Sequence, residues 1–162
     1  MRPYLDKAVP ESWRAAEAFA ASVGQNAEER GLTRAELELI NVRISQMNAC
    51  GFCLDLHSRQ ARQAGVPQQK LDLLAAWREA GVFSEREEAL LAVAEAGTRL
   101  PQSEELRADL VAAQQVLGDD VLAAAEWATV SINAFNRISI LSEHPVRARD
   151  ADGKVIRLRA TE

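Results

Sequence analysis

Apolar residues recur along this chain at the three- and four-residue spacing of helices, and most of these runs lie between helix start and stop signals. The clearest run begins at Thr33, because Thr33-Arg34-Ala35-Glu36 has the form of a capping box. Signals for strands are nearly absent. The sequence therefore predicts an all-α fold built as a compact helical domain. The apolar stripe after this capping box consists of Leu37, Ile40, Ile44 and Met47.

Glycines mark the expected ends of several helices, and Ser84-Glu85-Arg86-Glu87 forms a second capping box. The longest expected helix, 120–142, would span roughly 35 Å. Its apolar residues spread over more than one face, so we expect another subunit to cover part of that surface. The expected helices cover about 12–23 (ending at Gly24), a segment from 33, a segment through the cysteines to Gly65, and then 68–80, 84–97, 103–118 and 120–142.

The chain has 162 residues, of which 48% are hydrophobic, so it can bury the core of one ordinary domain. No linker or internal repeat divides it. We expect one helical domain over 1–145 and a charged tail over 146–162. The Asp152-Gly153 pair is a turn signal, so the tail either forms a small hairpin or remains mobile.

The formal net charge of −5 disfavours partners that are themselves anionic. Sequence-independent binding to nucleic acid needs a basic surface, and so does docking on an anionic membrane. No segment approaches the roughly 18 apolar residues of a spanning helix, and the N-terminus lacks the apolar core of a signal peptide. We therefore expect a soluble, cytoplasmic protein with no nucleic-acid or membrane partner.

The two cysteines, Cys50 and Cys53, stand three residues apart, and His57 follows four residues later. On a helix these residues share one face, and Cα atoms at this spacing lie within the range that a disulfide needs. Asn48 is the expected N-cap, and the positive end of the helix dipole would then favour a thiolate. His57 could take up the thiol proton. In a reducing compartment this pattern predicts redox or metal chemistry rather than a structural disulfide.

Two other interpretations of the cysteines remain open at this point. They could be small hydrophobic residues of the core, as buried free cysteines often are. They could also bind zinc, because a structural zinc site needs four ligands and the chain offers Cys50, Cys53, His57 and His144. His144 follows a long helix, however, where a histidine can simply interact with the last carbonyls, and no second Cys-x-x-Cys occurs. A redox role is the favoured interpretation.

Glu38 begins a polar row at helical spacing on the helix that starts near Thr33. By spacing alone, a solvated face is favoured over the lining of a wet pocket. Sequence spacing cannot place Glu38 near His57, because the two are expected on different helices. The row continues with Asn41, Ser45 and Asn48.

Polar side chains also interrupt the most apolar helix, at Asn133, Asn136 and Arg137. Buried amide and guanidinium groups must be hydrogen-bonded. We therefore expect these residues to cross-link helices or subunits, and we assign them no chemistry.

The run of Glu38, eleven residues, Cys50-Gly51-Phe52-Cys53, three residues and His57 resembles the signature of the alkyl hydroperoxidase D-like proteins, in the carboxymuconolactone decarboxylase superfamily. The similarity covers about Leu32 to Gly97, and segment 133–137 also resembles small members of the group. The motif is fairly specific, because it fixes four residue types at three spacings. The resemblance implies an all-helical fold, with the CxxC at the start of a central helix, assembled into trimers or hexamers.

The resemblance further implies peroxidase activity with defined roles. Cys53 would attack the peroxide and become a sulfenic acid, Cys50 would resolve it to a disulfide, and Glu38 and His57 would form the proton relay that activates Cys53. Some members carry a histidine where this chain has Phe52, so one proton donor is missing here. No bound cofactor or metal is implied, and the reductant would be an external dithiol of the lipoyl type. The alternative function is a non-catalytic redox sensor or interaction protein whose dithiol switches its assembly.

Overall fold

The computed structural model describes residues 2–150 and 152–156. Within these residues the chain folds into helices joined by short turns, and an isolated bridge in the tail is the only β-type pairing. The all-α prediction is therefore confirmed. The helices are α1 (Leu5–Ala8), α2 (Pro10–Glu29), α3 (Arg34–Met47), α4 (Gly51–Gln63), α5 (Gln68–Leu73), the 3₁₀ turn η1 (Leu74–Ala76), α6 (Trp77–Ala80), α7 (Glu85–Thr98) and α8 (Glu104–Leu141).

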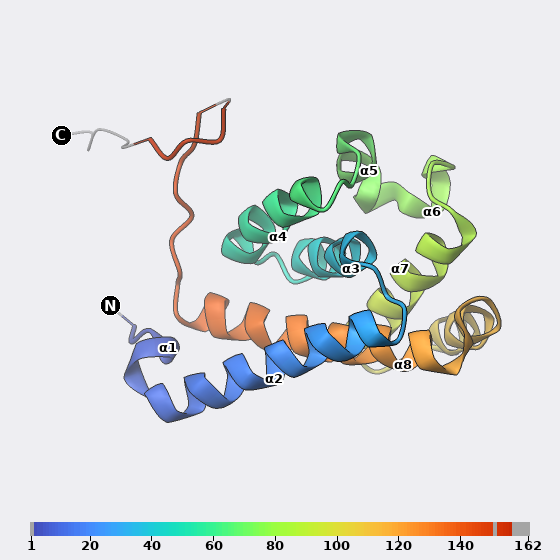
Figure 1. The fold of residues 1–162 in the computed structure, drawn as a ribbon, viewed down its shortest axis with the longest axis horizontal. Helices are drawn as coiled ribbons and strands as arrows, with labels where there is room; N and C mark the ends of the chain where they lie inside the picture. The colour runs from blue at the N-terminus through green and yellow to red at the C-terminus, as the bar shows by residue number, and fades with distance from the viewer. Residues whose placement is uncertain (1, 151, 157–162) are drawn as a thin grey trace.

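Helix α3 lies between α4 and α8, and α2 runs alongside α8 (Figure 1). One apolar cluster joins α2, α3, α7 and α8, and a second joins α3 and α7 to α4, α5, η1 and α6. Because α3 contributes to both clusters, it is buried around most of its circumference, and its polar side chains also lie beneath its neighbours. In α3, Ile40 and Ile44 belong to the first cluster, and Leu39 and Val42 to the second.

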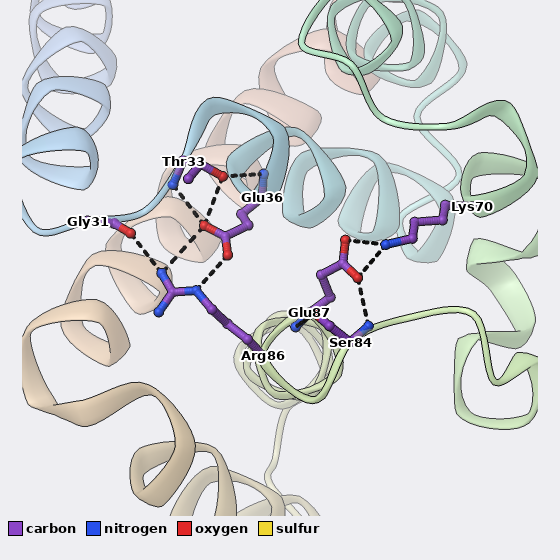
Figure 2. A network of polar contacts seen from close by, with 7 residues as sticks. All are labelled: Gly31, Thr33, Glu36, Lys70, Ser84, Arg86 and Glu87. Atoms are coloured by element: carbon purple, nitrogen blue, oxygen red, sulfur yellow. Dashed lines mark hydrogen bonds and ion pairs between the residues drawn. The ribbon is translucent and has the colours of Figure 1, made fainter.

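Both predicted capping boxes are present, at the starts of α3 and α7, and each is tied to a neighbouring helix (Figure 2). Glu36 of the first box accepts a hydrogen bond of 2.6 Å from Arg86 Nε on α7. Glu87 of the second box accepts bonds of 2.7 and 2.6 Å from Lys70 Nζ on α5. Burial alone would raise the pKa of Glu36, but hydrogen bonds from Arg86 and Thr33 outweigh it and lower that pKa. The boxes therefore fix helix packing as well as helix starts.

A buried carboxylate, Glu95 of α7, joins α3 and α6 to α7. Arg43 Nε of α3 donates to Glu95 Oε1 at 2.9 Å, and Trp77 Nε1 of α6 donates to the same oxygen at 3.0 Å. Burial would raise the pKa of Glu95, but the hydrogen bonds from Trp77 and Arg43 and the charges of Arg43 and Arg99 together lower it. The carboxylate is thus held ionised inside the protein.

The prediction that the first long helix ends at Gly24 is wrong. Helix α2 continues to Glu29, because Val23 and Ala27 on the same face are buried in the first cluster. Packing of this face outweighs the low helix propensity of one glycine. The chain leaves the helix instead at Gly31, whose φ of 82° is in the left-handed region.

The predicted helix 68–80 is divided into α5, η1 and α6. Its buried residues Leu71, Leu74 and Trp77 recur every third position, which is the period of a 3₁₀ helix rather than of an α-helix. The predicted break at Gly118 is confirmed: with φ 72° and ψ 166°, this residue interrupts α8 between two helical stretches.

The tail turns back beside α4. Arg149 Nε lies 3.6 Å from Asp55 Oδ1, and a Cβ on Gly51 would come within 3.4 Å of the Val146 side chain. An isolated antiparallel bridge joins Arg149 to Val155, so the described part of the tail forms a tight turn around Gly153, as one of the two expectations had it. Residues 151 and 157–162 lie outside the described residues, and the domain boundary at 145 stays a prediction.

None of the helices that the structure describes is long and apolar enough to cross a membrane.

Candidate active site

The two cysteines lie at the start of α4, where they are joined as a disulfide with a Cα–Cα distance of 5.4 Å. Cys50 is the N-cap residue, and its Sγ accepts a hydrogen bond of 3.4 Å from the Cys53 amide. The prediction that Asn48 caps this helix is therefore wrong. Asn48 ends α3, and Ala49, with a φ of 53°, turns the chain sharply from α3 into α4. The sharp turn leaves Cys50 in the capping position.

Asn48 instead connects α3 to α8. Its Nδ2 donates to Asn133 Oδ1 and Asn136 Oδ1, both at 2.9 Å. Asn136 Nδ2 donates in turn to Ser45 Oγ at 3.2 Å. The predicted cross-linking role is confirmed for Asn133 and Asn136, whereas the described hydrogen bonds of Arg137 stay within α8. The loop that carries the dithiol is thereby anchored to the longest helix.

Glu38 of α3 is completely buried, with 0% of its surface exposed, so the expectation of a solvated face is wrong. Helices α4 and α8 cover the polar row, and α4 brings His57 Nδ1 to 2.8 Å from Glu38 Oε2. Asn41 Nδ2 donates to the same oxygen at 3.4 Å. Arg34 Nη2 lies 2.6 Å from Oε1 and forms an ion pair without hydrogen-bond geometry. Glu38 is thus positioned to orient the imidazole and to stabilise its cation.

A cavity of about 430 Å³ lies beside these residues, between α2, α3, α4 and α8. Cys53, His57 and Glu38 all line it. The two cysteines are buried, at 2% and 3% exposed, and of the two only Cys53 is among the described residues that line the cavity. Of the two cysteines, Cys53 is therefore the one that borders the cavity. The apolar walls include Trp13, Val23, Leu37, Leu56, Ile132, Phe135 and Ile138.

The same cavity contains residues to which sequence reasoning assigned no role of this kind. His144 lines it near Phe52, with Nε2 at 3.2 Å from Asp6 Oδ1 and Nδ1 at 3.4 Å from Ser139 Oγ. Among the described residues, no three His, Cys, Asp or Glu side chains form a group that could hold a metal ion. The four residues of the zinc interpretation are therefore not gathered together. No local signal links Asp6 to His144, because they lie near opposite ends of the chain.

Comparison with known proteins agrees with this geometry. The model of the Carboxymuconolactone decarboxylase family matches residues 10–96. YdfG, an uncharacterized protein of Bacillus subtilis (strain 168), is 42% identical over 52 residues, which are 32% of this chain and 35% of YdfG. The alkyl hydroperoxide reductase AhpD of Methylobacterium sp. (strain 4-46) is 39% identical over 41 residues, 25% of this chain and 23% of that protein. The matched segments thus span about a third of the first relative and about a quarter of the second.

A solved structure matches most of the chain. It is ATU0492 from Agrobacterium tumefaciens, a protein of unknown function for which a role in antioxidant defence, as AhpD, has been suggested. It superposes with a TM-score of 0.76 at 31% identity, over 90% of this chain and 98% of that one. Since the family model covers more than half of the chain, including the whole CxxC helix, this protein belongs to the carboxymuconolactone decarboxylase family, with an alkyl hydroperoxidase D-like fold.

Proposed function

We propose that this protein is a dithiol-dependent hydroperoxide reductase. The observation that carries the proposal is the convergence of Cys53, His57 and buried Glu38 on one largely apolar cavity, with Cys50 bonded to Cys53 behind it. The relative from Methylobacterium is named an alkyl hydroperoxide reductase, which supports the same assignment. A cysteine pair that alternates between dithiol and disulfide, beside a histidine–carboxylate pair, suits two-electron reduction of an O–O bond.

In the first step, His57 accepts the Cys53 proton, and Glu38 stabilises the imidazolium across their 2.8 Å contact. The Cys53 thiolate attacks the outer peroxide oxygen. The O–O bond breaks, an S–O bond forms and the leaving oxygen takes up a proton, so the products are a sulfenic acid and an alcohol or water. The peroxide is reduced by the two electrons that the sulfur loses.

In the second step, the Cys50 sulfur attacks the sulfenic acid, releasing water and forming the Cys50–Cys53 disulfide. An external dithiol, of the lipoyl type, then reduces the disulfide by thiol–disulfide exchange. This cycle needs no bound cofactor and no metal. We further propose that the protein works in a reducing compartment such as the cytoplasm, where a dithiol donor is kept reduced.

We also propose that the working form is a homo-oligomer, a trimer or hexamer. Large apolar side chains are exposed along the second half of α8, where they would be costly for a monomer to leave in water. Trp127 is 57% exposed, and Val130 and Leu141 are exposed to a similar degree. A second copy of the chain would cover this surface.

The test is peroxide consumption by the purified protein, with dihydrolipoamide and other dithiols as donors. We expect continuous turnover that stops when Cys53 is replaced by serine. The alternative, a redox sensor, predicts one equivalent of peroxide consumed, a disulfide formed and no turnover with any dithiol donor. An inert thiol pair, unaffected by peroxide, would contradict both functions.

A further inference from the structure

The chain contains two histidines, and both line the cavity that holds Cys53. Each of them has a carboxylate at one ring nitrogen: Glu38 at His57, and Asp6 at His144. The first pair is accounted for by the proposed relay. The second pair comes from the two ends of the chain, and its place in the same cavity calls for a chemical role.

His144 is held in one orientation by its surroundings. Its ring packs against the rings of Tyr4 and Phe52, each at a centroid distance of 5.2 Å. Nε2 lies 3.2 Å from Asp6 Oδ1, so the carboxylate can accept a hydrogen bond from that ring nitrogen. Nδ1 lies 3.4 Å from the hydroxyl of Ser139, which also lines the cavity. A hydroxyl both accepts and donates a proton, so Ser139 can connect the ring to a molecule in the cavity.

The proposed reaction needs a proton for the peroxide oxygen that leaves when the sulfur attacks the other oxygen. When a thiolate cleaves an alkyl hydroperoxide, the leaving oxygen departs as an alkoxide, a strong base whose release is slow without an acid. Phe52, the residue next to Cys53, has no proton to give. His57 serves as the base that ionises Cys53, and its cation is stabilised by Glu38. Among the other described lining residues, His144 is the second imidazole, and a hydroxyl and a carboxylate lie at its two ring nitrogens.

We propose that His144, oriented by its contact with Asp6, is the proton source for the leaving oxygen, with the Ser139 hydroxyl as the donor that touches it. The assignment rests on the proposed reductase function. The step is balanced: the thiolate, the hydroperoxide and the His144 proton give the sulfenic acid, the alcohol and a neutral imidazole. His144 then regains a proton from water, while His57 returns to water the proton it took from Cys53. The cavity thus carries a basic pair and an acidic pair.

The test compares two oxidants that differ in their need for an acid. The tert-butyl hydroperoxide leaving group is an alkoxide, whereas peracetic acid releases acetate, which is stable without a proton. We expect His144→Gln to slow the oxidation of Cys53 by the alkyl hydroperoxide about tenfold or more, and to change the rate with the peracid much less. Ser139→Ala should show the same selectivity while leaving the His144–Asp6 pair intact, so the test survives if H144Q folds poorly.

Ser142→Ala is the matched control. Ser142 Oγ accepts a hydrogen bond of 3.0 Å from the Leu5 amide, so it also anchors the N-terminal arm, the segment of α1, to the end of α8. This variant should keep the wild-type ratio of the two rates. If H144Q and S139A react with both oxidants as wild type does, or lose the same factor with both, His144 only holds the arm and the assignment is refuted. A wild-type protein that reacts with neither oxidant would refute the reductase function and this assignment together.

Discussion

Replacing Glu38 with glutamine tests whether the buried carboxylate does chemistry or only fills space. The substitution keeps the shape of the side chain and a carbonyl oxygen that can still accept from His57 Nδ1. It removes the negative charge that would stabilise the imidazolium. Arg34, the other charged partner of Glu38, has a side chain that is 59% exposed. Water can therefore solvate its charge when the ion pair is lost. The fold should therefore survive the change.

The expected loss follows from the hydrogen bond between His57 and Glu38. A bond to a charged partner contributes about 1.5–3 kcal/mol, against about 1 kcal/mol for a neutral one. The difference, roughly 0.5–2 kcal/mol, applies only when His57 carries the Cys53 proton, and it corresponds to a rate about 2- to 30-fold slower. His57→Gln should cost at least about tenfold. Since a relay acts as a unit, the double variant should be little slower than the slower single variant.

Stopped-flow tryptophan fluorescence can follow the oxidation of Cys53 directly. Trp13 lines the cavity and packs edge-on against Phe135, with ring centroids 5.8 Å apart, so it should report changes at the dithiol. The rates should be measured across pH, because at high pH the thiol ionises unaided and the variants should partly recover. Glu36→Gln is the matched control: it makes the same change on the same helix, outside the cavity lining, and should react at the wild-type rate.

Two results would refute the reasoning. If Glu38→Gln reacts like wild type at every pH, the carboxylate is a packing residue and His57 acts without it. If the losses of Glu38→Gln and His57→Gln multiply in the double variant, the two residues act independently and do not form a relay.

Three further predictions concern the thiols, the core and the assembly. Cys50→Ser should leave a sulfenic acid on Cys53 that dimedone traps, whereas labelling of Cys50 in the Cys53→Ser variant would reverse the roles. Folding lowers the pKa of Glu95, so its ionised carboxylate stabilises the fold above pH 4.5, near the pKa of the unfolded chain. This stabilisation is lost as the pH falls through the lower pKa of the folded protein. Glu95→Gln should therefore make Tm fall less steeply at acid pH. Because it leaves the buried Arg43 without its anionic partner, it should also lower the free energy of unfolding by about 3–5 kcal/mol at neutral pH. An unchanged Tm would contradict this. Light scattering should give at least three chains for wild type and fewer for Trp127→Asp, and a wild-type monomer would exclude the proposed interface.

Local chemistry decided which features of the fold could be predicted from sequence. The capping boxes at Thr33 and Ser84 each involve residues three apart, so their geometry follows from the residue types. Gly24 and Gly31 look alike in sequence, and only the first is continued as helix. Burial of the neighbouring Val23 against α8 makes that difference, and no local rule contains it. The longer helices were therefore predictable, whereas α1, the end of α2 and the division of segment 68–80 were not.

The candidate site divides in the same way. Cys53 and His57 lie one turn apart on a single helix, so their shared face follows from spacing alone. Glu38 lies on another helix, and its spacing predicted a polar row without saying whether water or α4 would cover it. The family resemblance supplied the link that periodicity could not. Asp6 and His144 meet because α1 folds back on the end of α8, a contact that no pattern within either segment records.

Two physical arguments rank the cysteines differently. The helix dipole favours a thiolate at Cys50, the capping residue, whereas proximity to His57 and to the cavity favours Cys53 as the attacking thiol. In the proposed cycle these arguments apply to different steps. Cys53 is the sulfur that peroxide can reach, and His57 supplies the base that it needs. When the external dithiol attacks Cys53 in the disulfide, Cys50 is the leaving group, and a thiolate stabilised at a helix N-terminus leaves faster. A capping position would therefore weaken Cys50 as a nucleophile toward peroxide while speeding its release on reduction, so the order of the two cysteines along the helix suits both halves of the cycle.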